Sequence, residues 1–280
     1  MRWTFVNDAY YEEEKAVLKT GDLALQRGYA VFDYFRTSDS QPLFPDDYLD
    51  RFFNSASRLF ITIPQTREQI KNAIDSLIEK NQIAGDSGIR MLATGGYSPD
   101  SYTPVRGNLI IQQHPVALPG KEKFEQGMKI VTHEYMRDFP EVKSINYLMG
   151  IWLQQQLKEK EADDVVYFRN NIISEFPRAN IFIVTRDGKL ATPAQHILHG
   201  ITRKKVLQLA HEMLPVEKRD ISVNELKNAA EVFMTSTTKR LLPVIAIDGN
   251  PVGNGKPGKV TRQLYEQFMA MELQYLHAAK

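Results

Sequence analysis

Residues 164–184, DVVYFRNNIISEFPRANIFIV, carry the clearest information about the fold. Two runs rich in β-branched and aromatic residues, 164–169 and 172–175, flank the pair Asn170-Asn171. Asparagine tolerates the positive φ that a two-residue hairpin turn requires. The pattern therefore predicts a β-hairpin closed by the two asparagines.

The same hairpin gives the carboxylate of Glu175 an unusual position. Its register puts Glu175 opposite Val166, in a strand otherwise built of apolar residues. A buried carboxylate needs a cationic partner or several hydrogen-bond donors. Glu175 therefore either makes an ordinary ion pair, with Arg178 or Lys189, or holds the protonated ring nitrogen of a bound molecule.

Similar short apolar segments recur along the chain and alternate with helical patterns, which predicts an α+β (mixed α/β) fold. Pro45-Asp46-Asp47 is a good helix start, because proline suits the first turn and acidic side chains suit its positive end. The expected helices span about 45–60, 67–81, 144–160, 202–214 and 259–271, and the expected strands lie near 29–35, 89–94, 108–113, 129–135, 164–169, 180–185, 231–236 and 244–249.

A natural joint interrupts these patterns at residues 115–123, PVALPGKEK, where two prolines, a glycine and three charges occur together. The chain of 280 residues also exceeds the size at which one hydrophobic core usually stops growing. We expect a smaller α+β domain at 1–115, a linker at 116–123, and a larger domain at 124–280 that carries Lys143.

The composition excludes several classes of function. Lysine and arginine number 35 against 34 acidic residues, so the charge gives no footprint for nucleic acid or anionic membrane. The absence of cysteine excludes disulfides, thiolate catalysis and thiolate metal sites, and we expect no metal. The opening MRWTFVNDAYYEEEK lacks the apolar region of a secretion signal, and no apolar run approaches the roughly 18 residues of a membrane span. We expect a cytoplasmic protein.

Lys143 is a candidate nucleophile within PEVKSINYL, residues 140–148, ahead of a segment with helical apolar spacing. The helix dipole opposes a lysine at a helix start, so Lys143 is not there for helix stability. A partly desolvated amine has a lowered pKa and forms Schiff bases with aldehydes. Tyr147 lies four residues later on the same helical face. The alternative is a surface lysine whose stem covers apolar residues.

Two segments are candidate anion sites. Gly200-Ile201-Thr202 precedes an amphipathic helix, and free backbone N–H groups at a helix start bind anions. The run Thr235–Thr238 offers further hydroxyl and amide groups. The alternatives are a plain helix cap and a Ser/Thr-rich turn. Arg51 lies away from the apolar face of its helix and, taken alone, is a surface arginine.

The order of these motifs resembles that of the class IV aminotransferases, the fold-type IV pyridoxal-phosphate enzymes. They include branched-chain aminotransferases, D-amino acid aminotransferases and 4-amino-4-deoxychorismate lyases. The resemblance runs from about residue 20 to residue 270. It rests on six motifs in order, namely Arg27-Gly28 with Val31-Phe32-Asp33, Leu49-Asp50-Arg51, Lys143 with Asn146-Tyr147-Leu148, Ser174-Glu175 with Asn180-Ile181-Phe182, Leu198 with Gly200-Ile201-Thr202-Arg203, and Glu231-Val232-Phe233 with Thr235-Ser236-Thr237.

The resemblance implies a two-domain, D-amino acid aminotransferase-like fold with pyridoxal 5′-phosphate as cofactor. Lys143 would bind the cofactor's aldehyde covalently and then move a proton as acid and base. Glu175 would keep the pyridine nitrogen protonated, and Tyr147 would hydrogen-bond the ring hydroxyl. The phosphate ligands would be Arg51, the backbone of Ile201 and Thr202, and Thr237.

The resemblance also implies small-molecule partners, an amino acid and a keto acid, and a homodimer. An aromatic-rich N-terminal region is suited to an interface, although plain core is the alternative. Arginines bind carboxylates through paired hydrogen bonds, so one suits a monocarboxylic substrate and two suit a dicarboxylic one. The candidate substrate-binding residues are Tyr29, Arg36, Arg90, Arg137 and Thr238.

Several departures from the family pattern bear on the substrate. Thr94-Gly95-Gly96 stands where D-amino acid aminotransferases have a carboxylate-binding arginine. Asp33 and Tyr34 replace a glutamate and a glycine of the branched-chain enzymes, and Phe176-Pro177-Arg178 follows Glu175 where small residues are usual. The leading expectation is an aminotransferase for a small, apolar amino acid. The alternatives are a lyase that eliminates pyruvate from aminodeoxychorismate and a non-catalytic descendant.

Overall fold

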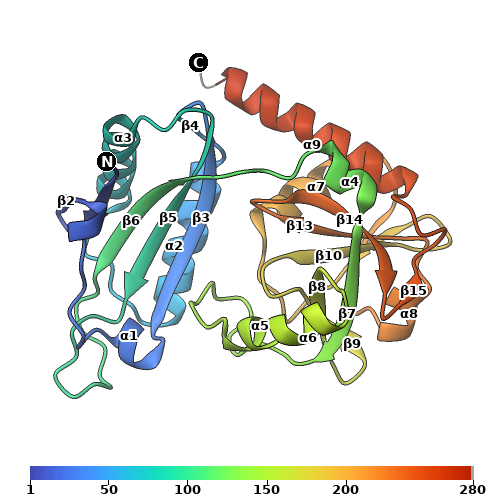
Figure 1. Ribbon diagram of the computed structural model, residues 1–280, viewed down its shortest axis with the longest axis horizontal. Coiled ribbons are helices and arrows are strands. Elements are labelled where there is room, and N and C mark those ends of the chain that lie inside the picture. Colours follow the sequence, from blue (N-terminus) through green and yellow to red (C-terminus); the bar gives the residue numbers. More distant parts are fainter. Residues whose placement is uncertain (279–280) are drawn as a thin grey trace. The chain divides into compact units, whose positions relative to one another are not determined.

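The computed structural model describes residues 1–278, and its backbone contacts divide them into two units (Figure 1). Unit 1 consists chiefly of Met1–Ala117 and Val142–Asn146. Unit 2 consists of Leu118–Glu141 and Tyr147–His277. The chain therefore passes from unit 2 into unit 1 and back again around Lys143.

Unit 1 is built on a six-stranded antiparallel sheet in the order β2-β1-β6-β5-β3-β4. The helix α2 packs on β3, and α3 packs on β1 and β6. The strands are β1 (Trp3–Val6), β2 (Ala9–Glu12), β3 (Ala30–Ser38), β4 (Gln41–Pro42), β5 (Asp86–Thr94) and β6 (Leu109–Pro115). The helices are η1 (Glu13–Lys15), α1 (Leu23–Arg27), α2 (Pro45–Arg58) and α3 (Arg67–Asn81).

The two faces of β3 differ, because successive side chains of a strand point to opposite sides. Val31, Asp33 and Phe35 are buried, whereas Phe32 and Tyr34 are half-buried on the other face. The side chain of Asp33 pairs with α2, so the buried residues lie on the helix-covered face. The opposite face is the one that presents Phe32.

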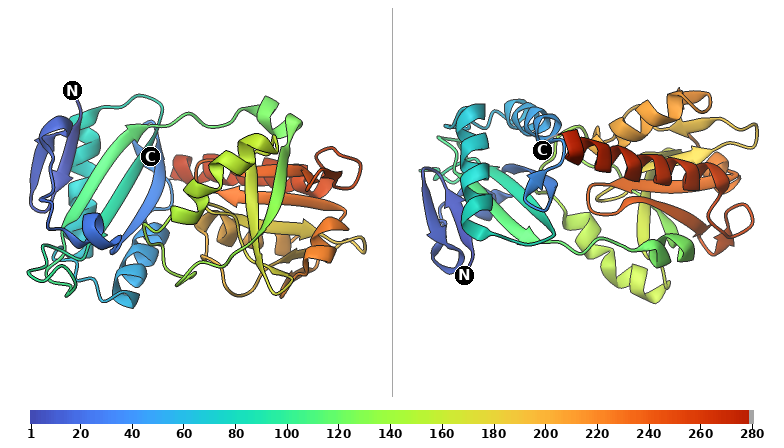
Figure 2. Two further views of the ribbon diagram at one scale, coloured as in Figure 1. Left: turned by 60° about the horizontal axis from the view of Figure 1, so that its bottom comes forward. Right: turned by 90° about the horizontal axis from the view of Figure 1, so that it is seen from above.

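Unit 2 is built on a nine-stranded mixed sheet in the order β12-β11-β10-β13-β14-β7-β8-β9, with β15 paired to β14. Figure 2 draws its strands and helices from two further directions. The strands are β7 (Met128–Glu134), β8 (Asp164–Arg169), β9 (Ile172–Ile173), β10 (Asn180–Val184), β11 (Leu190–Thr192), β12 (Val216–Lys218), β13 (Glu231–Ser236), β14 (Arg240–Ile247) and β15 (Asn250–Pro251). The helices are α4 (Lys121–Gln126), α5 (Leu148–Trp152), α6 (Gln154–Glu159), α7 (Ile201–His211), α8 (Val223–Lys227) and α9 (Lys259–Ala278).

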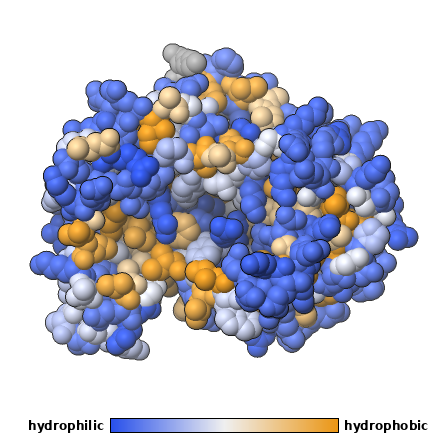
Figure 3. Space-filling model, viewed as in Figure 1, coloured by the Kyte–Doolittle hydropathy of each residue, from blue (hydrophilic) through white to orange (hydrophobic). Residues whose placement is uncertain are grey.

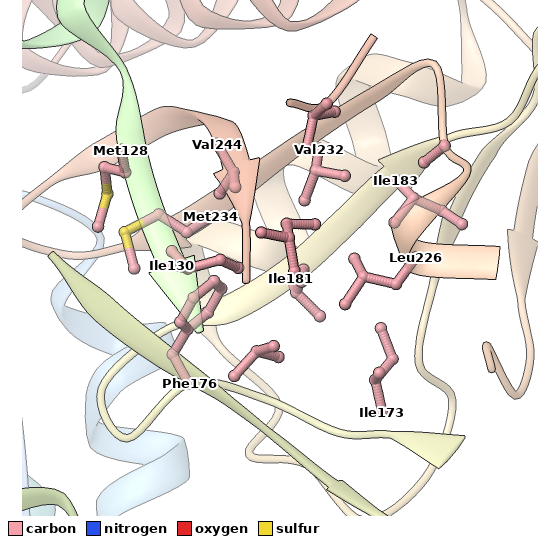
Figure 4. Packing of buried hydrophobic residues seen from close by; sticks show 14 of the residues in the cluster. Met128, Ile130, Ile173, Phe176, Ile181, Ile183, Leu226, Val232, Met234 and Val244 are labelled. Atoms are coloured by element: carbon pink, nitrogen blue, oxygen red, sulfur yellow. The ribbon is translucent and has the colours of Figure 1, made fainter. Parts of the chain in front are cut away.

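The core of unit 2 explains one departure from the family pattern. Phe176 is fully buried among apolar side chains from several strands, including Ile181 and Met234 (Figure 4). Burying an aromatic side chain contributes roughly 1.5–3 kcal/mol. Phe176 therefore serves the core of this unit, directly beside Glu175 in the sequence.

The hairpin prediction is confirmed. Asn170 and Asn171 both have positive φ, 49° and 64°, and β8 pairs with β9 through Phe168 and Ile173. The exact pairing differs near Glu175, whose carbonyl oxygen accepts from the N–H of Tyr167 at 2.9 Å rather than facing Val166 in a regular ladder.

The helix expected over 144–160 is partly wrong, because its first residues are extended. The N–H of Phe32 donates to the Lys143 carbonyl at 2.9 Å, and the N–H of Ile145 donates to the Ala30 carbonyl at 3.2 Å. These bonds attach the segment to the edge of β3. The first helix of the stretch 144–160 is therefore α5, which begins at Leu148. The same bonds also group Lys143 with unit 1, whereas the C-terminal domain was expected to carry it. The division at 116–123 into folding domains stays a prediction.

Hydrophilic side chains cover much of the visible surface of each unit (Figure 3). Within residues 1–278, no helix combines the length and apolar character that a membrane crossing requires.

Candidate active site

The backbone of Lys143 is fixed from two sides within unit 1. Its carbonyl accepts the Phe32 N–H, and its own N–H donates to the hydroxyl of Ser55 on α2 at 3.2 Å. Ser55 is completely buried. Lys143 itself lies outside the helices and strands, but hydrogen bonds to β3 and to α2 fix the point from which its side chain begins.

The aromatic ring of Phe32 connects the two cations of this cluster. The Nζ atom of Lys143 lies 4.6 Å from the ring centroid, and the Cζ atom of Arg90 lies 4.9 Å from it. Since each cation is within about 5 Å of the same centroid, the two lie no more than about 10 Å apart. An amine, an apolar ring and a guanidinium are thus neighbours on one face.

The three candidate arginines occupy different surroundings. Arg36 is only 3% exposed, so protein encloses its guanidinium. Arg137 lies in unit 2 and forms an ion pair with Glu175. Arg90 is exposed and, among residues 1–278, forms no ion pair. Of the three, Arg90 is the arginine that remains accessible to a carboxylate.

Arg51 lies on the helix-covered side of the sheet, against Asp33. Its Nε donates to Asp33 Oδ2 at 2.9 Å and its Nη2 donates to Oδ1 at 2.7 Å. The side chains are 9% and 0% exposed. The surface position that the isolated helix suggested for Arg51 is therefore wrong, because the helical pattern did not include the strand beneath. Its role toward a phosphate stays a prediction.

The tyrosines of this unit are fixed by packing. The hydroxyl of Tyr29 donates to the carbonyl of Leu59, and burial raises the pKa of Tyr29. Burial also raises the pKa of Tyr34, and the charge of Arg36 opposes this. A Cβ at Gly88 would lie 1.7 Å from the Tyr34 hydroxyl, so the ring of Tyr34 occupies the space above Gly88.

Glu175 is the centre of a second cluster, in unit 2. Its Oε1 accepts from Arg137 Nε at 2.8 Å and from Arg137 Nη2 at 2.7 Å, and its Oε2 accepts from the Leu198 N–H at 2.8 Å. Neither Arg178 nor Lys189, the partners expected for an ordinary ion pair, is its partner in these bonds. The carboxylate thus has the cation and the donors that a buried charge needs.

Two further titratable groups act electrostatically with Glu175. Burial lowers the pKa of Arg203 to about 10, and the negative charge of Glu175 opposes that shift. Burial raises the pKa of Tyr167, and Glu175 adds to this rise. The surroundings therefore combine two arginines with a neutral phenol around one carboxylate.

A candidate anion cup lies at the start of α7. Gly200 at the N-cap has no side chain with which to cap the first-turn N–H groups of Ile201 and Thr202. A Cβ at residue 200 would lie 2.1 Å from Asn180 Oδ1, so glycine lets the Asn180 side chain approach this helix start. Asn180 Nδ2 donates to the Leu198 carbonyl at 2.7 Å.

A buried hydroxyl faces the same region. Thr235 is 2% exposed, and its Oγ1 has no hydrogen-bond partner among residues 1–278. Thr235 pairs with Asn180 across β13 and β10, and paired residues of neighbouring strands project from the same face. An unsatisfied hydroxyl beside an uncapped helix start is what a phosphate oxygen would complete.

The remaining predicted residues lie at element ends of unit 2. Tyr147 is the N-cap residue of α5 and is half-buried. Thr237 and Thr238 are half-buried in the connection between β13 and β14. Their roles toward cofactor and substrate stay predictions. Among residues 1–278, no three His, Asp or Glu side chains are grouped as metal ligands.

Each of the two units holds groups that suit pyridoxal 5′-phosphate. Lys143 supplies an amine on an ordered backbone, Glu175 supplies a charged acceptor, and the start of α7 supplies N–H donors beside the Thr235 hydroxyl. These are the groups that an aldehyde, a ring nitrogen and a phosphate respectively require.

Three contributors were missed in the sequence, namely Ser55, Arg203, and Arg137 as the partner of Glu175. Each acts through a contact with a residue outside its own motif. Of the three, only Arg203 had a local signal, since it stands inside a quoted motif, whereas Thr235 belongs to a run already named as a candidate anion site.

Known proteins match both the sequence and the fold. The model of the amino-transferase class IV family matches residues 30–247. A D-alanine aminotransferase of Bacillus licheniformis is 29% identical over 264 residues, which cover 92% of this chain and 93% of that protein.

Branched-chain amino acid aminotransferases are among the similar solved structures. One from T.th., with pyridoxamine 5′-phosphate, has a TM-score of 0.89 at 25% identity, covering 97% of this chain and 94% of the other. That of Escherichia coli has a TM-score of 0.89 at 28% identity, covering 96% and 94%. These matches confirm the fold-type IV fold. The chain belongs to the class IV aminotransferases, enzymes that use pyridoxal 5′-phosphate as cofactor.

Proposed function

We propose that this enzyme transfers the amino group of a small, apolar, monocarboxylic amino acid to a 2-keto acid. One observation carries the substrate class: Lys143 and a single accessible arginine, Arg90, both lie over the Phe32 ring, within about 5 Å of its centroid. The guanidinium suits one carboxylate, and the ring suits an apolar side chain. A dicarboxylic substrate such as aminodeoxychorismate would favour two converging arginines.

Lys143 would perform the proton transfers. Its Nζ would hold the cofactor until the substrate amine takes its place, and the freed amine would then act as general base toward the proton on the substrate α-carbon and as general acid when it returns that proton. Bound pyridoxal 5′-phosphate supplies an electrophilic carbonyl and an electron-accepting ring. The backbone bonds of Lys143 to Phe32 and Ser55 support this role, because they fix the origin of the side chain.

Glu175 and Tyr147 would orient the ring. Glu175 would hold a proton at the pyridine nitrogen through its carboxylate, which Arg137 and the Leu198 N–H already support. Tyr147 would donate to the ring hydroxyl. Both roles come from the family resemblance, and the burial of Glu175 supports the first.

The phosphate would be bound by backbone and side-chain donors. The N–H groups of Ile201 and Thr202 would donate to phosphate oxygens, assisted by Thr237 and the buried Thr235 hydroxyl. Arg51, oriented by Asp33, would add a positive charge.

The relatives support a small apolar substrate without fixing its stereochemistry. The protein of similar sequence is named for D-alanine, and the proteins of similar fold are named for branched-chain amino acids. All of these amino acids have small apolar side chains. Thr94-Gly95-Gly96 provides no arginine, and the Thr94 hydroxyl instead donates to Asp22 at 2.8 Å. Arg90 would therefore bind the substrate carboxylate, the role that an arginine at residues 94–96 has in the D-amino acid aminotransferases.

The test is a half-reaction without any acceptor. The holoenzyme is mixed with L- and D-forms of alanine, valine, leucine, isoleucine and glutamate, and its visible spectrum is followed. We expect lasting conversion to the pyridoxamine form and one keto acid per site with an apolar member. No conversion with any amino acid, together with turnover of aminodeoxychorismate, would identify a lyase; failure to bind the cofactor would identify a non-catalytic descendant.

A further inference from the structure

Arg137 and Glu175 form a buried ion pair whose geometry is specific. Two guanidinium nitrogens of Arg137 converge on one carboxylate oxygen, Oε1, at 2.8 and 2.7 Å. The other oxygen, Oε2, accepts a neutral N–H from Leu198. The positive charge is thus concentrated on one side of the carboxylate, and a backbone donor fixes the other side.

Arg137 is itself held in place. Its Nη2 also donates to the carbonyl of Pro140, three residues further along the chain. The side chains of Arg137 and Glu175 are only 11% and 5% exposed. An arginine with this many protein acceptors is poorly suited to exchange them for a substrate carboxylate, which was its expected role.

We propose that Arg137 is a positioning residue that keeps Glu175 charged and correctly oriented, a role that rests on the function proposed above for Glu175. A buried carboxylate that loses its cation is destabilised in the charged form and takes up a proton. A protonated Glu175 would donate rather than accept a hydrogen bond, and would no longer hold a proton at the ring nitrogen. Arg137 thereby determines the pH range in which Glu175 can act.

The other groups that face Glu175 do not replace Arg137. Arg203, from α7, donates to Thr192 Oγ1 at 3.2 Å and to the Pro193 carbonyl at 2.9 Å. Tyr167, from β8, is a neutral phenol, and burial raises its pKa further above the ordinary value. Arg203 therefore interacts with Glu175 through space, whereas Arg137 contacts it directly.

The chain offers a matched control. Arg240 Nε donates to Glu272 at 2.8 Å, and these side chains are 16% and 5% exposed. This ion pair has similar burial and lies in the same unit. Arg240→Met therefore reports the general cost of breaking a partly buried pair.

The experiment compares Arg137→Met, Arg137→Lys and Arg240→Met with the wild type. The first readout is the infrared carbonyl band of a protonated carboxylic acid, followed against pH and assigned by its loss in the Arg137→Met/Glu175→Gln double variant. We expect this band in Arg137→Met to persist to a higher pH than in the wild type. Arg137→Lys, which retains the charge, should shift it back toward the wild type, and Arg240→Met should leave it unchanged.

The second readout is the half-reaction rate. Because the charged carboxylate is needed, the Arg137→Met rate should fall about 100-fold at neutral pH and recover as pH rises, while Arg240→Met stays within about threefold. An unchanged acid band in Arg137→Met, or an equal loss of rate in Arg240→Met, would overturn the proposal. The band needs no turnover, so a wild type without any half-reaction would contradict the proposed function alone. If Arg137→Met does not fold, the neutral variant Arg137→Gln takes its place, and an acid band unshifted from the wild type in Arg137→Gln would also overturn the proposal.

Discussion

Asp33 and Arg51 join strand β3 of unit 1 to α2, the helix that covers it, through both oxygens of one carboxylate. Removing one partner of a buried ion pair leaves an uncompensated charge, which costs about 3–5 kcal/mol. We expect Asp33→Ala to lower the free energy of unfolding by about this amount in urea titration. Asp46→Ala, which breaks exposed pairs with Arg67 and Lys71, should cost about 1 kcal/mol or less. Equal losses of unfolding free energy in the two variants would mean that the buried pair of Asp33 contributes no more than an exposed pair.

Lys143 is expected to carry the cofactor. Borohydride reduction should fix the cofactor to this residue, as peptide mapping would show, and Lys143→Ala should abolish transfer because both attachment and proton transfer are lost. Lys160→Ala, an exposed change, should keep both. Finding the reduced cofactor on another lysine would refute the assignment.

Glu175→Gln separates binding from turnover. The amide retains much of the shape but not the charge, so we expect near-normal cofactor affinity with turnover lowered by roughly two or more orders of magnitude. Affinity is measured by fluorescence titration and turnover by keto-acid release. Near-normal turnover would mean that the ring nitrogen has another partner.

Arg90→Met tests the carboxylate site beside Phe32. Loss of a charge-assisted hydrogen bond costs about 1.5–3 kcal/mol, which is roughly a 10- to 150-fold decrease in kcat/KM for the amino acid. Cofactor affinity should not change. Arg169→Met, an exposed change in the other unit, is the control and should leave both values unaltered. An unaffected kcat/KM in Arg90→Met would move the carboxylate site elsewhere.

A homodimer is expected from the family resemblance. The helix α5 adds a physical reason, because Leu148, Ile151 and Trp152 are 77%, 68% and 60% exposed on it. Large apolar side chains grouped on one short helix favour an interface. Sedimentation equilibrium should give twice the chain mass, and Trp152→Glu should shift it toward the monomer. A fully active wild-type monomer would contradict this expectation.

The elements that could be predicted are those specified by neighbouring residues. The hairpin at Asn170-Asn171 follows from two asparagines between two apolar runs, and its turn was found as predicted. The helix expected at 67–81 has those limits, because Thr66 and Gln69 form a capping box at its start. In both cases the information lies within a few residues.

The parts that could not be predicted depend on distant contacts. Residues 144–146 begin a longer segment with helical apolar spacing, yet hydrogen bonds to β3, more than a hundred residues earlier, hold these first residues extended. Likewise nothing near Arg137 indicates that its partner is Glu175, 38 residues later. The order of the motifs was enough to name the candidate residues. It did not indicate which of those residues pair with one another.

The segment Val142–Asn146 has a consequence for how this chain is made. During synthesis, residues 1–117 leave the ribosome first, yet the edge of β3 at Ala30 and Phe32 gains its partners only when Lys143 and Ile145 follow. A gene divided at the linker would therefore encode an N-terminal product with an incomplete sheet and a C-terminal product with an unattached lysine segment. The products of the two halves of the gene therefore depend on each other. The segment from the second half that completes the sheet of the first contains Lys143, the residue proposed to react.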